Sequence, residues 1–411
     1  MTIFDVIIIG SGIAGLYATY KIKQSSPETN YLVLEKKSKP YIGGRASNEL
    51  FYGTSIVTGA GIGRKRDKLL KSLYSELGFE IKEFKSVTTY STLVEPLDVS
   101  KTLKQLREEY KGPPTTFEKF AKPILGEDVY KRFLYSSGYT DYEKADAYDT
   151  LYNYSMEDNA GRLIGFGVQW HKLILALADE IGKSNIKFHQ NVIKILPSCR
   201  EEDGSSRIYE LETETGMKYR CSKVIVATTI TGLRTLFPKH PVYREVEGQP
   251  FLRMYGKFTK QSLPILDEYA GRYIVVPGLI QKMIAMNRED GVYMIVYNDN
   301  KNTLKLKDRL ENTESNREYY CKLIERSLGI PSNKHLHLIG IRSFYWKVGT
   351  HYYKPLNPQK YKTRDEFIYD AQHPDTNILV VGEVVSKHQG WTEGALESVE
   401  SVITKKWIHS K

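Results

Sequence analysis

Residues 4–16 read FDVIIIGSGIAGL, and this stretch decides how the rest of the chain is interpreted. An apolar run typical of a strand leads directly into Gly10, Gly12 and Gly15, which have the spacing G-x-G-x-x-G. The pattern predicts a helix over residues 13–24 and a second strand over residues 31–34, with an acid directly after it. Strand, turn, helix, strand and acid in this order predict a unit that binds a dinucleotide.

Each part of this unit has a mechanical role. Gly10 allows the tight turn, Gly12 lets a pyrophosphate approach the backbone, and Gly15 lets the helix pack closely on the strand. The pyrophosphate would lie at the positive end of the helix, and Glu35 would accept hydrogen bonds from the adenosine ribose. A merely structural glycine turn is the less favoured interpretation. The predicted cofactor contacts here are Gly10, Gly12, Ile13, Ala14, Gly15, Glu35 and Lys36.

A second glycine pair, Gly43 and Gly44, is followed by Arg45, soon after the acid. At this point the sequence resembles the flavin-containing amine oxidase superfamily, in which a G-G-R segment follows the ribose-binding acid. The resemblance implies that the cofactor is FAD and that Arg45 contacts its pyrophosphate. A planar guanidinium suits that contact because it can donate two parallel hydrogen bonds.

The end of the chain resembles the matching half of the same family. Residues 377–383 read NILVVGE, and residues 390–398 read GWTEGALES. The resemblance implies that Gly382 and Glu383 lie against the ribityl-phosphate part of FAD. It also implies that a helix starting near Trp391 points its N-terminus, with Thr392 and Ala395, at the flavin edge where negative charge collects.

The resemblance covers roughly residues 1–80 and 370–411 strongly and the middle only by weak pattern. It implies an α/β fold: a Rossmann-like FAD-binding domain, with a parallel sheet plus a β-meander, and an interleaved α+β substrate domain. We expect the FAD-binding domain to comprise residues 1–85, 185–235 and 370–411. The substrate-binding domain would comprise residues 86–184 and 236–369.

Weaker matches in the middle supply further expected contacts. Gly59, Ala60 and Gly61 lie in a segment that resembles the one running along the flavin. Val192 lies in a strand that resembles the one supplying backbone groups to the adenine.

Four residues are candidates for the chemistry. The segment FLRMYGKF at residues 251–258 resembles the strand whose lysine holds a water on flavin N5, and Arg253 or Lys257 stands in that place. Tyr352 and Trp391 resemble the two aromatic walls that guide an amine to the flavin, since rings attract cations. Ordinary strand and core packing are the alternatives. His351 occupies the place of a cysteine that bonds flavin in monoamine oxidases, and we expect non-covalent FAD with His351 near the dimethylbenzene edge.

The implied function is an FAD-dependent amine oxidoreductase. Hydride would pass from an amine carbon to flavin N5, and molecular oxygen would reoxidise the flavin. One alternative is an FAD-dependent desaturase or porphyrinogen-type oxidase with a larger, more apolar cavity. Another is a flavin-binding protein without turnover.

Composition sets the remaining limits. A chain of 411 residues, 41% hydrophobic, is long enough for two globular domains. Its three cysteines lack metal or disulfide spacing, so we expect no metal and a cytoplasmic location. No apolar run approaches the ~18 residues of a membrane span.

The net charge of +10 fits a basic surface better than nucleic-acid binding. The acidic residues 138–158 fit a solvated loop better than the wall of a substrate funnel.

Overall fold

The computed structural model describes residues 2–159, 162–197 and 207–409. Its first elements are the predicted βαβ unit: β1 (Ile3–Ile9), α1 (Ile13–Ser25) and β2 (Tyr31–Leu34). β1 and β2 pair in parallel, with Ile8 opposite Val33. The dinucleotide-binding start of the fold is therefore formed as the glycine motif and its flanking apolar runs predict.

The first sheet combines parallel strands with an antiparallel meander. Its order is β10-β11-β12-β1-β2-β9, and β18 pairs in parallel with the C-terminal part of β12. The meander is formed by β10, β11 and β12, as predicted, whereas the short β9 pairs with β2 at the opposite edge. The hairpin tip expected near residues 203–204 lies outside the described residues. The bounds are β9 (Ile186–Lys187), β10 (Val192–Pro197), β11 (Tyr209–Thr213), β12 (Lys218–Val226) and β18 (Ile378–Val380).

Helices cover both faces of this sheet, because the side chains of its central strands, such as β1, are apolar on both faces. Successive side chains of a strand point to opposite faces, so Ile8 packs into one core while Ile7 packs into the other. A strand buried on both faces is apolar throughout, as residues 6–9 are. The Ile8 face carries α1, α2 (Lys68–Glu76), α7 (Trp170–Glu180) and α13 (Thr392–Glu400), while the Ile7 face carries α8 (Ile230–Leu236) and α12 (Arg364–Gln372).

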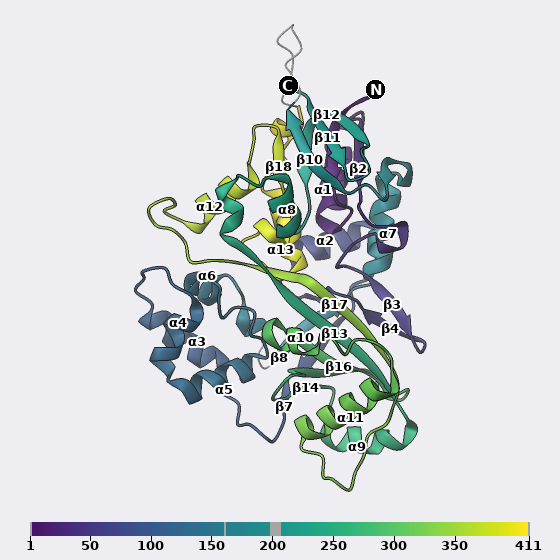
Figure 1. The fold of residues 1–411 in the computed structure, drawn as a ribbon, viewed down its shortest axis with the longest axis vertical. Coiled ribbons are helices and arrows are strands. Elements are labelled where there is room, and N and C mark those ends of the chain that lie inside the picture. The colour runs from purple at the N-terminus through teal and green to yellow at the C-terminus, as the bar shows by residue number, and fades with distance from the viewer. Residues whose placement is uncertain (1, 160–161, 198–206, 410–411) are drawn as a thin grey trace.

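The second sheet forms the middle of the lower part of the molecule in Figure 1. Its order is β17-β13-β16-β15-β14-β7, and the two long strands β13 and β17 extend up towards the first sheet (Figure 1). One face packs on α9 (Leu263–Tyr269), α10 (Asn300–Leu306) and α11 (Glu314–Leu328). The strands are β7 (Thr89–Tyr90), β13 (Val246–Phe258), β14 (Tyr273–Val275), β15 (Lys282–Asn287), β16 (Val292–Asp299) and β17 (Leu338–Tyr353).

A helical insertion and two small sheets complete the fold. The insertion has its own apolar core, built around rings such as Phe117 and Phe133. It comprises α3 (Val99–Glu109), α4 (Phe117–Leu125), α5 (Glu127–Ser137) and α6 (Ala147–Tyr152). The small sheets contain β3 (Asn48–Phe51), β4 (Thr54–Val57), β5 (Ile62–Arg64), β6 (Glu83–Val87) and β8 (Arg162–Gly167), and a last helix is α14 (Lys405–His409). The residue boundaries of the two domains stay a prediction.

The acidic residues that follow α5 are buried, so their interpretation as a solvated loop is wrong. Asp141 and Glu143 are 9% and 8% exposed, and Asp146 is 2% exposed. Asp146 caps α6 by accepting hydrogen bonds from the backbone N–H groups of Tyr148 and Asp149. Sequence pattern could not show this burial, because it results from packing of the insertion against distant segments.

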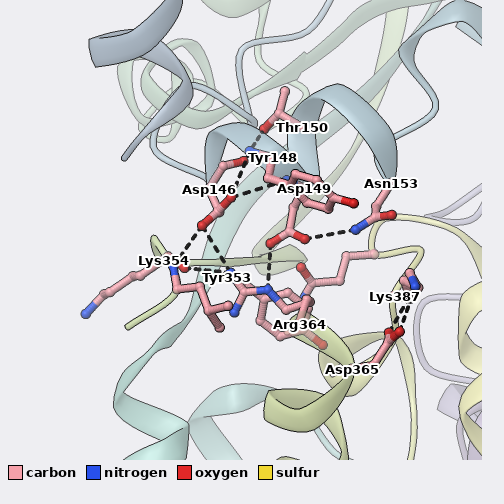
Figure 2. A network of polar contacts seen from close by, with 12 residues as sticks. Asp146, Tyr148, Asp149, Thr150, Asn153, Tyr353, Lys354, Arg364, Asp365 and Lys387 are labelled. Carbon is pink, nitrogen blue, oxygen red and sulfur yellow. Dashed lines mark hydrogen bonds and ion pairs between the residues drawn. The ribbon is translucent and has the colours of Figure 1, made fainter. Parts of the chain in front are cut away.

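Figure 2 shows the buried network that joins the insertion to α12. The Arg364 guanidinium donates from Nε to Asp149 at 2.7 Å and from Nη2 to the Lys354 carbonyl at 3.0 Å. It also lies 3.4 Å from an Asp146 oxygen, and its side chain is only 5% exposed. At the edge of the same view, Lys387 and Asp365 form an exposed ion pair.

We expect Arg364→Met to lower the free energy of unfolding by about 3 kcal/mol, because it leaves buried carboxylates without their cation. Lys387→Met removes an exposed pair and should change the free energy by less than about 1 kcal/mol. Urea unfolding of the two variants measures the difference. Equal changes in the free energy of unfolding of the two variants would show that the buried network does not stabilise the packing of the insertion.

Among the described residues, no helix is long and apolar enough to cross a lipid bilayer. Within the same ranges, no group of histidine, cysteine or acidic side chains is arranged to hold a metal ion.

Candidate cofactor and substrate site

The glycine turn after β1 fits a phosphate at the start of α1. A Cβ on Gly10 would lie 2.3 Å from the Ala227 carbonyl oxygen, and one on Gly15 would lie 2.0 Å from the Gly10 carbonyl oxygen. A Cβ on Gly12 would instead meet nothing within 4 Å. No side chain caps α1, so the N–H groups of its first turn, including those of Ile13 and Ala14, face an open approach.

Glu35 lies beside this turn, as the fingerprint requires, and is 9% exposed. One carboxylate oxygen, Oε2, accepts from both the N–H and the hydroxyl of Ser11, at 2.8 and 2.9 Å. The other, Oε1, accepts from the Lys37 N–H at 2.8 Å. A carboxylate can accept about four hydrogen bonds. The protein fills three positions and orients the group, which leaves Oε1 with capacity for a ribose hydroxyl.

Two other predicted cofactor contacts, Val192 and Lys36, lie near Glu35. Backbone hydrogen bonds bring Val192 close, and Lys36 is the next residue of the chain. The Glu35 N–H donates to the Lys187 carbonyl and the Glu35 carbonyl accepts from the Gln190 N–H, each at 2.8 Å. These bonds bring the start of β10, with the buried Val192, to the acid. Lys36 is exposed beside it.

Glu383 joins its own segment, which includes Gly390, to two segments that are distant in the sequence. Its carboxylate accepts from the Arg45 guanidinium at 3.1 Å and from the Gly390 N–H at 2.8 Å. It also accepts from the His351 N–H at 2.9 Å and from His351 Nδ1 at 2.5 Å. Burial raises the pKa of Glu383, but His351, the Arg45 guanidinium and the bond from the Gly390 N–H outweigh it and hold the pKa well below its usual range. Glu383 is therefore ionised and fixed.

Arg45 is held in place but keeps part of its guanidinium open. Its Nη1 donates to Glu383 and to the Gly349 carbonyl at 2.7 Å, while its side chain remains 30% exposed. The N–H groups on Nε and Nη2 remain available for an anion. Ahead of it, Gly43 donates to the Ser11 carbonyl at 2.9 Å, and Gly44 has open space where a Cβ would lie. The G-G-R segment therefore lies directly over the glycine turn.

The His351 ring connects Glu383 to α8. Its Nε2 accepts the Ile230 N–H at 3.2 Å, so the ring proton is on Nδ1, where it meets Glu383. Both ring nitrogens are thus occupied by the protein, and the side chain is fully buried. Sequence reasoning placed His351 near a flavin edge and missed its role as a partner of Glu383.

The C-terminal motif begins α13 beside the same turn. A Cβ on Gly382 would lie 3.8 Å from the Ala14 methyl group, so the Gly-acid pair adjoins α1. Trp391 is the N-cap residue of α13, and no side chain caps this helix, which leaves the N–H groups near Thr392 free. Glu393 accepts the Leu69 and Leu70 N–H groups at 2.8 and 2.9 Å and so ties α13 to α2. Ala395 is buried in the first core.

Three aromatic side chains hold the segment expected to run along the flavin. Tyr255 donates its hydroxyl to the Val57 carbonyl at 2.6 Å. The indole N–H of Trp346 donates to the Thr58 carbonyl at 2.8 Å, and that of Trp170 donates to the Gly61 carbonyl at 2.9 Å. At the middle of the segment, Ala60 donates to the Arg45 carbonyl at 2.7 Å, and a Cβ on Gly59 would lie 2.3 Å from that oxygen. Nothing in the sequence pattern identified these aromatic residues, because their partners are backbone groups of a distant loop.

The two candidates for the residue near flavin N5 differ in position. Arg253 is 5% exposed and faces the flavin segment, with Nη2 3.1 Å from where a Cβ on Gly61 would lie. Lys257 reaches away and donates to the Asp290 carbonyl. The geometry therefore favours Arg253 over Lys257 as the basic group beside the predicted flavin.

The two predicted aromatic walls have different neighbours. The Arg64 guanidinium lies over the Trp391 ring, 3.7 Å from its centroid. An ion pair with Asp67 holds that arginine in place. Tyr352 is half-buried and is paired across the strands with Glu247. No ring contact joins Tyr352 to Trp391 in the described part of the chain. The aromatic cage stays a prediction.

A surface cavity of about 610 Å³ lies elsewhere, between α12 and α13, with Tyr369 and Lys387 among its lining residues. None of the predicted site residues lines it. The residues that fit FAD are instead the open glycine turns, the uncapped starts of α1 and α13, the oriented acid Glu35 and the partly free Arg45.

Comparison with known proteins agrees with this geometry. A family model described as flavin containing amine oxidoreductase matches residues 65–401, and one described as an NAD(P)-binding Rossmann-like domain matches residues 8–77. A comparison with curated protein sequences finds no significant match.

Solved structures share the fold over nearly the full length. A double mutant of putrescine oxidase has a TM-score of 0.72 at 14% identity, covering 97% of this chain and 98% of that chain. Cyclohexylamine oxidase from Brevibacterium oxydans IH-35A has a TM-score of 0.72 at 16% identity, covering 98% of each chain. A putative protoporphyrinogen oxidase from Exiguobacterium sp. 255-15 has a TM-score of 0.69 at 14% identity and full coverage of both chains.

We expect Glu35→Ala and Arg45→Ala each to weaken FAD binding by about 2–3 kcal/mol, because each removes a charge-assisted contact in a partly buried site. Titration of the apoprotein with FAD, followed by flavin fluorescence, measures the loss. Lys322→Ala, which removes an exposed charge on α11 away from the predicted cofactor contacts, is the control. Unchanged FAD affinity in both variants would contradict the predicted contacts.

We expect FAD to be bound without a covalent link, because both nitrogens of the nearest candidate residue, His351, are occupied by protein groups. Acid precipitation of the yellow protein should leave the flavin in the supernatant. Flavin that stays with the precipitated protein would contradict this expectation.

Proposed function

This chain belongs to the flavin-containing amine oxidoreductase family and is an FAD-dependent oxidoreductase, and from this premise we propose that its substrate is an amine. The resemblance seen at the two ends of the sequence, the α/β fold and the FAD cofactor are confirmed by the family match. The substrate is a small molecule, and we propose molecular oxygen as the electron acceptor. Similar structures include oxidases of putrescine and of cyclohexylamine, which supports an amine.

The observation that carries the proposal is a buried acid, Asp141, that contacts Thr350 close to the start of the C-terminal motif. Asp141 accepts from the Tyr154 hydroxyl and, at 3.4 Å, from the Thr350 hydroxyl. The Thr350 methyl group lies 3.9 Å from where a Cβ on Gly390 would be, just before Trp391. A carboxylate in this position attracts a cation such as a protonated amine.

Burial and then the Asp299 carboxylate raise the pKa of Asp141 to about 7. The group can therefore take up and release a proton near neutral pH, where an amine must lose its ammonium proton before oxidation. Asp141 would receive the substrate, and the aromatic side chains around residues 57–61 would exclude water. The chemistry that FAD would supply when bound is acceptance of a hydride from the amine carbon.

The test is an anaerobic panel of primary amines, diamines, amino acids, a porphyrinogen and non-amine alcohols, followed at the flavin absorption band. Amines should bleach the band, and admission of air should restore it with formation of hydrogen peroxide. Bleaching by porphyrinogens or other non-amines alone would place the chain with the desaturase or porphyrinogen-type alternative. FAD binding with no bleaching by any compound would indicate a flavin protein without turnover.

Asp141→Asn tests the role of the acid. For the wild-type protein we expect kcat/KM to rise as the pH increases through about 7, because Asp141 becomes ionised there. The asparagine variant should lose this rise and keep its FAD. Asp365→Asn, which removes an exposed acid on α12, is the matched control. A wild-type pH profile in Asp141→Asn would contradict the assignment.

A further inference from the structure

Two buried basic side chains lie on the face of the second sheet that is turned towards the flavin segment. Arg253 on β13 is 5% exposed and Lys282 on β15 is 1% exposed. Both lie over the ring of Tyr297, with the guanidinium carbon 4.4 Å and the lysine nitrogen 4.1 Å from its centroid. Lys282 also lies 3.0 Å from the centroid of Tyr139, whose hydroxyl bonds to that of Tyr297. The two basic side chains thus share one aromatic wall.

Both basic side chains have donors with no acceptor. Across the described ranges, neither Arg253 Nε nor Lys282 Nζ has a hydrogen-bond partner. The Nη1 of Arg253 contacts the sulfur of Met294 at 3.7 Å. A buried donor left unpaired costs about 1–3 kcal/mol, and more when it is charged. Two such donors beside one ring indicate a place where a bound group completes the hydrogen bonds.

The nearby acids do not supply these bonds. Asp299 accepts from the N–H and hydroxyl of Thr140 and from the Gln281 amide. Asp141 accepts from the hydroxyls of Tyr154 and Thr350. Burial lowers the pKa of Lys282 well below its usual value, while Asp299 and Asp141 oppose this shift and Arg253 adds to it. An anion arriving between Arg253 and Lys282 would therefore favour the protonated lysine.

We propose that Arg253 and Lys282 form a subsite for a carboxylate group of the substrate, beside residues 59–61. A carboxylate offers two oxygens to two donors and carries a single charge that the pair can neutralise. The subsite rests on the proposed function and narrows its substrate class to amines that carry a carboxylate, amino acids among them. Asp141 would receive the ammonium end of the same molecule.

The first test uses benzoate and the isosteric neutral benzamide as probes of the FAD-loaded protein. Benzoate should perturb the flavin absorption band and compete with the amine, whereas benzamide should bind at least about tenfold more weakly. Lys282→Met and Arg253→Met should each weaken benzoate binding by at least about tenfold. Lys334→Met is the matched control, since it removes an exposed lysine that lies over Tyr269. Equal binding of the two probes, or normal benzoate binding by both subsite variants, would overturn the proposal.

A second readout separates a charge role from a structural one. At about pH 8, benzoate binding should take up protons because the anion stabilises protonated Lys282. Calorimetry in two buffers of different ionisation enthalpy measures this uptake. The facing groups are Arg253, Asp141, Asp299 and the two tyrosine rings, so Asp141→Asn should retain the uptake while Lys282→Met loses it.

The outcomes distinguish failure of the carboxylate subsite from failure of the proposed amine oxidation. Oxidation of simple amines together with a lack of benzoate preference overturns the subsite alone. Absence of amine oxidation overturns the proposed function, whatever benzoate does. Should Lys282→Met not fold, Lys282→Gln, which keeps a donor but no charge, takes its place, and undiminished benzoate binding by that variant overturns the subsite.

Discussion

The buried carboxylate of Glu383 is the contact on which the arrangement of the site depends. It accepts hydrogen bonds from Arg45, from the backbone and ring of His351 and from Gly390. These groups come from the loop after β2, from β17 and from the turn before α13. One fixed negative charge therefore holds the first and last parts of the chain against the second sheet.

A second constraint positions the segment between the two sheets. Tyr255, Trp346 and Trp170 each donate to a backbone carbonyl of residues 57–61. These donors come from β13, β17 and α7, so the segment is fixed by both halves of the fold. An FAD bound along it would face the aromatic and basic surface of the second sheet, including Arg253. The same surface carries the buried donors proposed to receive a carboxylate.

Short-range pattern was sufficient for the cofactor half of the protein. The turn geometry at Gly10 and Gly15, the register of β1 with β2 and the place of Glu35 follow from steric limits within one βαβ unit. The contact between Arg45 and Glu383 was not predicted, because no local rule brings residues so far apart in the sequence together. The interpretation of the acidic stretch was wrong, since the burial of Asp141 depends on packing against another part of the chain.

By itself, the sequence determined that a dinucleotide unit begins the chain, because that signal is local in spacing and chemistry. The matching motif near residues 382–398 was implied by the family resemblance. Only the tertiary structure decided that Arg253 faces the flavin segment while Lys257 turns to Asp290. It alone brought Lys282 beside Arg253, from a strand that carries no recognisable motif. The physical reason is that strand pairing and side-chain burial depend on contacts between distant residues, which periodicity does not encode.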